Sequence, residues 1–207
     1  MAKMTATEMI KIAQAILDSE IAAVKKLTTQ MNKSLKEITE LLFNCQGKVL
    51  VTGAGTSRAV AQRFAHLLAC CGTAGIFISA ADSLHGGAGV ITNNDVVYII
   101  SKGGQSQEIN KFAAIARARG AKIVAHTENP HSPLAQLSDA IYHIVAEGEI
   151  DPYGMIATGS SLVNSAACDV LCVLLLKLRG YSAEEFGFTH PEGAVGLKIT
   201  TAGTDSK

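Results

Sequence analysis

The sequence predicts an α/β fold, a doubly wound five-stranded parallel sheet flanked by helices and preceded by two N-terminal helices. Three observations support this prediction. From residue 48 onward, short apolar runs alternate with segments of helical periodicity. The connections between these runs are long enough to hold helices, as parallel strands require. The composition is 48% hydrophobic but only 5% aromatic, which suits a sheet buried on both faces by small and β-branched side chains.

The first 46 residues read as a helical extension. Residues 5–30 carry apolar side chains at helical spacing, with charged residues on the other face. A second helix follows, whose apolar positions Leu35, Ile38 and Leu42 lie on one side. These two helices either cover the sheet or pair with a second subunit, and the periodicity fits both arrangements.

The α/β core is expected over residues 48–199, so that the 207 residues form one domain. The predicted strands are 48–52, 75–79, 95–100, 121–126 and 140–145. The predicted helices between and after them are 57–71, 107–119, 132–137 and 158–179. In such a sheet, ligands bind beyond the carboxyl ends of the strands, so the loops that follow the strands are the places to search.

Charge and cysteine content exclude several classes of function. The chain has 18 basic and 18 acidic residues, which argues against nucleic acid or an anionic membrane as a partner. Its longest apolar run, Val170–Leu176, is too short for a bilayer, and Met1–Met9 lacks a signal segment, so we expect a cytoplasmic protein. The five cysteines form no recurring C-x-x-C pair, so we expect structural thiols and no bound metal.

The loop after the first strand, G-A-G-T-S-R at residues 53–58, does not fit a dinucleotide site. Arg58 occupies the place of the third glycine, and the chain has no G-K-[ST] sequence. The loop instead presents Gly55, Thr56 and Ser57 at a helix N-terminus, where backbone N–H groups and hydroxyls suit a single phosphate. The alternative is that Ser57 only caps its helix.

The loop after the third strand, S-K-G-G-Q-S-Q-E at residues 101–108, has the same design. Ser101, Gly104 and Ser106 are candidate phosphate-binding residues at the start of another helix. Lys102 adds a charge that suits phosphate, although a solvated lysine is equally compatible with the sequence. Two such loops in one sheet are hard to explain as caps alone.

Four motifs in this order resemble the phosphosugar isomerase (SIS) domain. They are G-A-G-T-S at residue 53, H-G-G at residue 85, S-x-G-G-Q-S-x-E at residue 101 and H-P-E-G-x-x-G at residue 190. The resemblance covers residues 48–199 and is greatest to the arabinose-5-phosphate isomerase group. It implies that Ser57, Ser101 and Ser106 bind the phosphate of a sugar phosphate. The paired C-terminal regulatory (CBS) modules of many members are not expected here.

The resemblance also implies catalytic residues and an oligomer. Glu108 and Glu149 match the two acidic positions of the isomerase site, and His190 matches its histidine. Because related domains lend this histidine across a subunit interface, we expect a homo-oligomer, either a dimer or a tetramer. The implied reaction is an aldose–ketose isomerisation through a cis-enediolate, with no dissociable cofactor.

Each of these roles has a plainer alternative. Glu149 is the preferred base, but it can be a solvated glutamate, and Glu147 and Asp151 lie close to it in the sequence. Glu108 can simply stabilise the dipole of its helix. His190 can be an ordinary loop histidine. His85 is either a substrate contact or a turn residue, and no second ligand at metal spacing accompanies it.

The sequence departs from the arabinose-5-phosphate isomerase group at four positions. These are Thr56 in place of lysine, Gly87 in place of aspartate, Gly103 in place of serine and Glu192 in place of glycine. One hypothesis is that Lys102 or Arg58 supplies the charge missing at Thr56. The departures keep two alternative functions open: a non-catalytic, regulatory sugar-phosphate-binding domain, and an isomerase of another sugar phosphate such as a hexulose 6-phosphate.

Overall fold

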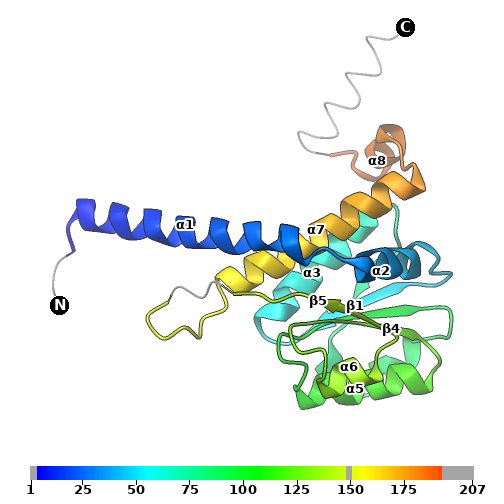
Figure 1. The fold of residues 1–207 in the computed structure, drawn as a ribbon. Coiled ribbons are helices and arrows are strands. Elements are labelled where there is room, and N and C mark those ends of the chain that lie inside the picture. The colour runs from blue at the N-terminus through cyan, green and yellow to red at the C-terminus, as the bar shows by residue number, and fades with distance from the viewer. Residues whose placement is uncertain (1–3, 148–150, 193–207) are drawn as a thin grey trace, which may run out of the picture.

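A computed structural model, which describes residues 4–147 and 151–192, contains the predicted five-stranded parallel sheet (Figure 1). The strand order is β2-β1-β3-β4-β5, and every neighbouring pair is parallel. The order of a doubly wound sheet is therefore present, with the chain leaving β1 in one direction and β3 in the other. The strands are β1 (Val49–Gly53), β2 (Gly75–Phe77), β3 (Val96–Ile100), β4 (Lys122–Thr127) and β5 (Ala140–His143).

Helices cover both faces of the sheet, and alternate residues of β1 show the two layers. Val49 and Val51 pack in one apolar cluster with α1, α2, α3 and α7, whereas Leu50 packs in a second cluster with α4, η1, α5 and α6. This alternation is the period of two expected of a strand buried on both faces. The helices are α1 (Ala6–Gln30), α2 (Lys33–Phe43), α3 (Thr56–Cys70), α4 (Ala80–Ser83), the 3-10 helix η1 (Gly87–Val90), α5 (Gln107–Ala118), α6 (Pro133–Leu137), α7 (Gly159–Arg179) and α8 (Ala183–Thr189).

The long helix α7 is apolar enough, by length and composition alone, to cross a membrane. In this fold it packs against α1, α2 and α3, and it buries residues along its whole length, from Gly159 to Leu175. Its high hydropathy is thus that of a helix in the centre of the core. Gly180, with φ of +62°, ends the helix in the left-handed conformation that glycine adopts without strain.

Among the described residues, the N-terminal helix α1 is buried only toward its C-terminal end. Thr5 and Glu8 form a capping box at its start, while Ala23 and Leu27 are its only buried residues. Figure 1 shows the N-terminal half of α1 projecting past the start of α7. The second helix is seated more firmly, because Ile38 and Leu42 of α2 are completely buried.

Two strands are shorter than predicted by two residues, each for a local reason. The second strand ends at Phe77 because Ser79 begins α4, its hydroxyl accepting a hydrogen bond from the Asp82 amide. The fifth strand ends at His143, and the Val145 amide donates to Gln30 Oε1 on α1 instead of continuing the ladder. Three short elements, α4, η1 and α8, were not predicted, since none is long enough to show a helical period.

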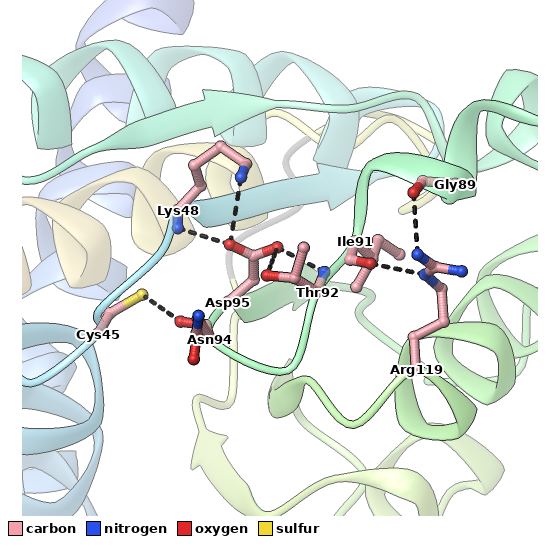
Figure 2. Close-up of polar contacts among 8 residues, drawn as sticks. All are labelled: Cys45, Lys48, Gly89, Ile91, Thr92, Asn94, Asp95 and Arg119. Atoms are coloured by element: carbon pink, nitrogen blue, oxygen red, sulfur yellow. Dashed lines mark hydrogen bonds and ion pairs between the residues drawn. The ribbon is translucent and has the colours of Figure 1, made fainter.

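The amino edge of the sheet is held by Asp95, immediately before β3 (Figure 2). Its carboxylate accepts the Lys48 amide at 2.7 Å and the Thr92 amide at 2.7 Å, and Lys48 Nζ lies 3.4 Å away. Burial alone would raise the pKa of Asp95, but these hydrogen bonds and the lysine charge lower it overall. Nearby, Arg119 donates to the carbonyls of Ile91 and Gly89. This edge is structural and lies opposite the edge that binds ligands in such sheets.

Candidate functional site

The two glycine- and serine-rich loops leave neighbouring strands at the carboxyl edge. β1 and β3 are paired from Val49 with Val96 to Gly53 with Ile100, so both strands end at the same level. The chain then enters α3 on one face of the sheet and α5 on the other. This divergence creates the crevice in which doubly wound proteins bind ligands. The structure therefore brings the two predicted phosphate-binding loops together.

The first loop is a tight glycine turn. Gly55, with φ of +58°, is the N-cap residue of α3 and supplies no side-chain cap. A Cβ atom on Gly53 would lie 2.7 Å from the carbonyl oxygen of Ser57, so the close approach of strand and helix requires glycine there. Ser57 is the second residue of α3 and not its cap, so the capping alternative is wrong. The N-terminal amides of the helix remain directed toward the crevice.

Thr56, at the position where lysine stands in the similar group, lines an open groove. Glu20 of α1 and Leu162 of α7 form its other walls, together with Thr158 just before α7. The volume of this groove is about 440 Å³. Arg58 lies elsewhere, because its guanidinium carbon sits 5.5 Å from the centre of the Phe77 ring on β2. That cation–π contact gives Arg58 a structural role in this chain.

The third-strand loop is folded more tightly than the first. Ser101 is buried, and its amide donates to the carbonyl of His126 on β4. Gly104, with φ of +64°, turns the chain, and its amide donates to the Ser101 carbonyl. Ser106 is the N-cap of α5, yet its hydroxyl makes no cap hydrogen bond. Half-buried Glu108 lies in the first turn of α5, so both of its predicted roles fit its position.

The connection from β4 to α6 supports the third-strand loop, and the sequence did not predict this support. The carbonyl of Lys102 accepts hydrogen bonds from the Thr127 hydroxyl at 2.8 Å and the Glu128 amide at 3.0 Å. A Cβ atom on Gly104 would lie 2.1 Å from Ser132 Oγ. The available signal was the T-E-N-P sequence directly after the fourth strand, which places turn formers at the carboxyl edge.

A buried polar network lies beneath the third-strand loop and was also missed. His126 Nε2 lies 2.9 Å from Asn164 Oδ1 on α7, and His126 Nδ1 lies 3.0 Å from the Tyr98 hydroxyl. Burial lowers the pKa of His126 to about 4, although the bond to Asn164 opposes that effect. The contacts fit a neutral imidazole that donates from Nε2 and accepts at Nδ1. A histidine directly after the apolar run 123–125 of the fourth strand was the signal in the sequence.

The acidic segment after β5 is only partly described. Glu149, the preferred base, lies outside the described residues. Its neighbour Glu147 is exposed and forms a 2.5 Å ion pair with Lys26 of α1, whose hydrogen bond and charge lower the pKa of this carboxyl. These contacts connect Glu147 to α1, so its carboxylate is engaged in an ion pair and Glu149 stays the preferred base.

Asp151 organises the loop that follows. Its carboxylate accepts hydrogen bonds from the amides of Tyr153, Met155 and Ile156, at 2.9, 2.9 and 2.8 Å. Desolvation tends to raise the pKa of Asp151, but these backbone hydrogen bonds lower it overall. Asp151 therefore has a structural role here. The side chains of Tyr153, Met155 and Ile156 in this loop are exposed.

His190 lies far from the two loops of its own chain. Its ring stacks on Phe186 with centroids 3.9 Å apart, its Nδ1 lies 3.1 Å from the Phe186 carbonyl, and its Nε2 lies 3.4 Å from Cys70 Sγ. Cys70 is the last residue of α3 and Thr56 the first, which separates them by about 20 Å along the helix axis. A single chain therefore does not bring His190 to the crevice.

His85 lies beyond β2, at the carboxyl side of the sheet. It is exposed, and its amide donates to the Asp82 carbonyl at the end of α4. Gly86, with φ of +109°, follows it, so a turn role for His85 is consistent with the backbone. Within residues 4–147 and 151–192, no three His, Cys, Asp or Glu side chains are placed to hold a metal ion.

Comparison with known proteins gives the family. The chain is 33% identical over 192 residues to the arabinose 5-phosphate isomerase KdsD of Pseudomonas aeruginosa, a match that covers 93% of this chain. It is 33% identical over 184 residues to KdsD of Salmonella typhi, which covers 89% of this chain. The chain spans only 59% and 56% of the length of these relatives.

Solved structures agree with this relationship. A provisionally named sugar-phosphate isomerase of Listeria monocytogenes has a TM-score of 0.89 and 28% identity, covering 92% of this chain and 100% of its own. The c3406 protein of Escherichia coli, solved in complex with arabinose 5-phosphate, has a TM-score of 0.87 and 28% identity, covering 91% of this chain and 100% of its own. The model of the SIS domain family matches residues 42–174, and the chain belongs to that family.

Proposed function

We propose that this protein is a phosphosugar aldose–ketose isomerase that binds the phosphate of its substrate between the β1 and β3 loops. The observation that carries the proposal is the convergence of two Gly/Ser loops, each at a helix N-terminus, where β1 and β3 end side by side. Two sets of free helix amides and the Ser57, Ser101 and Ser106 hydroxyls provide donors for one phosphate dianion.

Arabinose 5-phosphate and ribulose 5-phosphate are the proposed substrate pair. The KdsD relatives are named as arabinose 5-phosphate isomerases, and the c3406 structure holds that sugar phosphate. Holding the phosphate at the helix N-termini leaves C1 and C2 of a five-carbon chain to extend across the carboxyl edge. The chain that follows β2, which carries His85, leaves the sheet at this same edge, and Glu149 follows β5 in the sequence.

The proposed chemistry moves one proton between adjacent carbons. A base removes the proton from C2 of the open-chain aldose while O1 is protonated, which gives a cis-enediol. The proton then returns to C1 as the O2 proton is lost, and the ketose forms without a redox cofactor. We assign the base to Glu149. Glu108 and the His190 of a second subunit are the proposed acids for ring opening and oxygen protonation.

Exchange of the C2 proton tests this proposal directly. The protein is incubated in deuterated water with a panel of pentose and hexose phosphates, and NMR follows label at C2. Incorporation with arabinose 5-phosphate, lost in Glu149→Gln and retained in the control Glu147→Gln, is the expected result. Incorporation of deuterium only with a hexulose 6-phosphate would instead make that sugar phosphate the substrate.

Thr56 favours one alternative function, a sugar-phosphate-binding regulator, and the same experiment tests it. Without the lysine of the similar group, the site lacks one cation near the phosphate, and a sugar-phosphate-binding regulator would not need it. Tight binding by calorimetry with no C2 exchange for any sugar phosphate would establish that rival and overturn the isomerase proposal.

A further inference from the structure

Cys70, the last residue of α3, contacts two imidazole rings. The Nε2 atom of His190 lies 3.4 Å from Cys70 Sγ, and the Nε2 atom of His66 lies 3.6 Å from the same sulfur. His66 is four residues before Cys70 on α3, so the two side chains share one face of that helix. His190 comes from a different element, the C-terminal end of α8. Two basic ring nitrogens therefore meet at one thiol.

The hydrogen bonds of His190 fix which of its nitrogens carries the proton. Its Nδ1 lies 3.1 Å from the carbonyl oxygen of Phe186, which can only accept, so Nδ1 is the donor. The Phe186 ring also stacks on the imidazole and fixes its plane. In the neutral ring Nε2 is then unprotonated and accepts from the Cys70 thiol. A nucleophile, a base and a group that orients the base is the arrangement found at activated nucleophiles.

The ends of two helices favour the charges that activation creates. Transfer of the thiol proton to His190 leaves a thiolate beside an imidazolium. Cys70 ends α3 and His190 is the C-cap residue of α8, and the partial negative charge of a helix C-terminus stabilises a nearby cation. A protonated His66 would in addition donate a charged hydrogen bond to the thiolate. Both imidazoles can therefore stabilise the reactive form of the sulfur.

Cys45 provides a comparison within the same chain. It is half-buried, as Cys70 is. Its Sγ, however, donates to the carbonyl of Asn94 at 3.5 Å (Figure 2). A carbonyl cannot take the proton, so this contact favours the neutral thiol. The two cysteines differ in their hydrogen-bond partners more than in their exposure.

The remaining three cysteines are less accessible or less activated. Cys168 lies 4.0 Å from His126 Nδ1 but is completely buried, which keeps reagents away. Burial raises the pKa values of Cys71 and Cys172. These thiols fit the structural role that the sequence predicts for cysteines in this chain.

We propose that Cys70 is a site of reversible modification by hydrogen peroxide, activated by His190 and His66. The sulfur attacks one peroxide oxygen while its proton passes to His190 Nε2. An S–O bond forms and the O–O bond breaks, so the sulfur loses two electrons and the peroxide gains them. The leaving hydroxide takes the proton from Nε2 and departs as water, and the product is a sulfenic acid, which thiols reduce.

The modification would reach the candidate site through His190. A sulfenic acid adds an oxygen at the sulfur that faces Nε2, the nitrogen with which His190 would act as an acid. Oxidation of Cys70 would thus hinder the proposed isomerisation. The reactivity of Cys70 itself rests on its own contacts and does not require the isomerase function.

Alkylation of the folded wild-type chain tests the activation of Cys70. The protein is treated with iodoacetamide at pH 7, and mass spectrometry of its peptides follows each cysteine. Cys70 should react at least about tenfold faster than Cys45, because a thiolate and not a thiol is the nucleophile. Equal rates, or a faster reaction of Cys45, would overturn the proposal.

Histidine variants test the cause of that reactivity. His190→Asn and His66→Asn should each slow the alkylation of Cys70 at least about threefold, whereas the matched control His131→Asn, at an exposed histidine on another loop, should not. The buried Cys168 reports on folding, because it becomes reactive only if a variant unfolds. A Cys70 rate that neither variant slows in folded protein would contradict activation by the imidazoles.

Hydrogen peroxide tests the modification directly. Dimedone, which traps sulfenic acids, should label Cys70 in preference to Cys45, and prior treatment with a thiol reductant should prevent the labelling. The absence of an adduct at Cys70, or equal adducts at both cysteines, would overturn the proposal. Labelling of Cys70 without loss of isomerase activity would support this site and count against the proposed role of His190.

Discussion

His190 Nε2 lies 3.4 Å from Cys70 Sγ, at the opposite end of α3 from Thr56. The helix that starts at the candidate phosphate site therefore ends at the histidine implied as an acid. About 20 Å of helix separates the two ends, too far for one chain to use both in a single site. If the proposed reaction uses His190, each site combines residues of two chains.

Mixing two inactive variants tests whether each site combines residues of two chains. Ser57→Asp places a negative charge at the phosphate loop, and His190→Ala removes the acid, so each variant alone should lack isomerase activity. Co-refolded in equal amounts, they should recover on the order of a quarter of the wild-type activity, because half of the dimers are mixed and each mixed dimer has one intact site. A mixture as inactive as its components would show that His190 acts within its own chain or not at all.

Lys102 is expected to contribute to binding of the phosphate. Lys102→Met should weaken the affinity for arabinose 5-phosphate by about tenfold or more, the effect of one lost charged contact. Calorimetry with the sugar phosphate measures this directly. Lys111→Met, on the exposed side of α5, is the matched control and should bind normally. Equal affinities for the two variants would assign the missing charge to another residue.

Adjacent glycines in the third-strand loop should differ sharply in their tolerance of alanine. Gly104 has φ of +64°, and its added Cβ would overlap Ser132, so Gly104→Ala should lower the free energy of unfolding by at least about 2 kcal/mol. At Gly103 no atom lies within 4 Å of an added Cβ, and its φ is not positive, so Gly103→Ala should change stability by no more than about 0.5 kcal/mol. Urea unfolding measures both, and similar losses would contradict the backbone assignment.

Acid should destabilise the fold through His126. Its pKa is lowered to about 4 in the folded chain, against about 6.5 when exposed, so protons bind the unfolded state first as the pH falls. The neutral imidazole then contributes fully above pH ~6.5, and its contribution is lost between pH ~6.5 and ~4, by about 3 kcal/mol in total. The free energy of unfolding of His126→Gln should vary less with pH over that interval. Parallel pH profiles for variant and wild type would exclude this role.

The sequence predicted the regular part of the fold well. All five strands and the helices α1, α2, α3, α5, α6 and α7 were expected, because each has a clear period or apolar run. The positions of the two glycine- and serine-rich loops could also be predicted, since glycine and serine after a strand are local signals. Their role in binding phosphate stays a prediction.

The elements that the sequence did not reveal depend on contacts between distant residues. The bond of Val145 to Gln30 ends β5 early, and the contact of His190 with Cys70 fixes where that histidine lies. Likewise, the support of the Lys102 carbonyl by Thr127 arises only when β3 and β4 pair. Periodicity describes neighbours along the chain and carries no information about such pairs.

The hydrogen bonds of Asp151 have a kinetic consequence for anything that contacts the loop after β5. Because its carboxylate accepts from the amides of Tyr153, Met155 and Ile156, the backbone of this loop is already fixed within the chain itself. A ligand or subunit that contacted the loop would cost little further backbone entropy there. The rate of such a contact should therefore be limited by orientation and not by loop ordering.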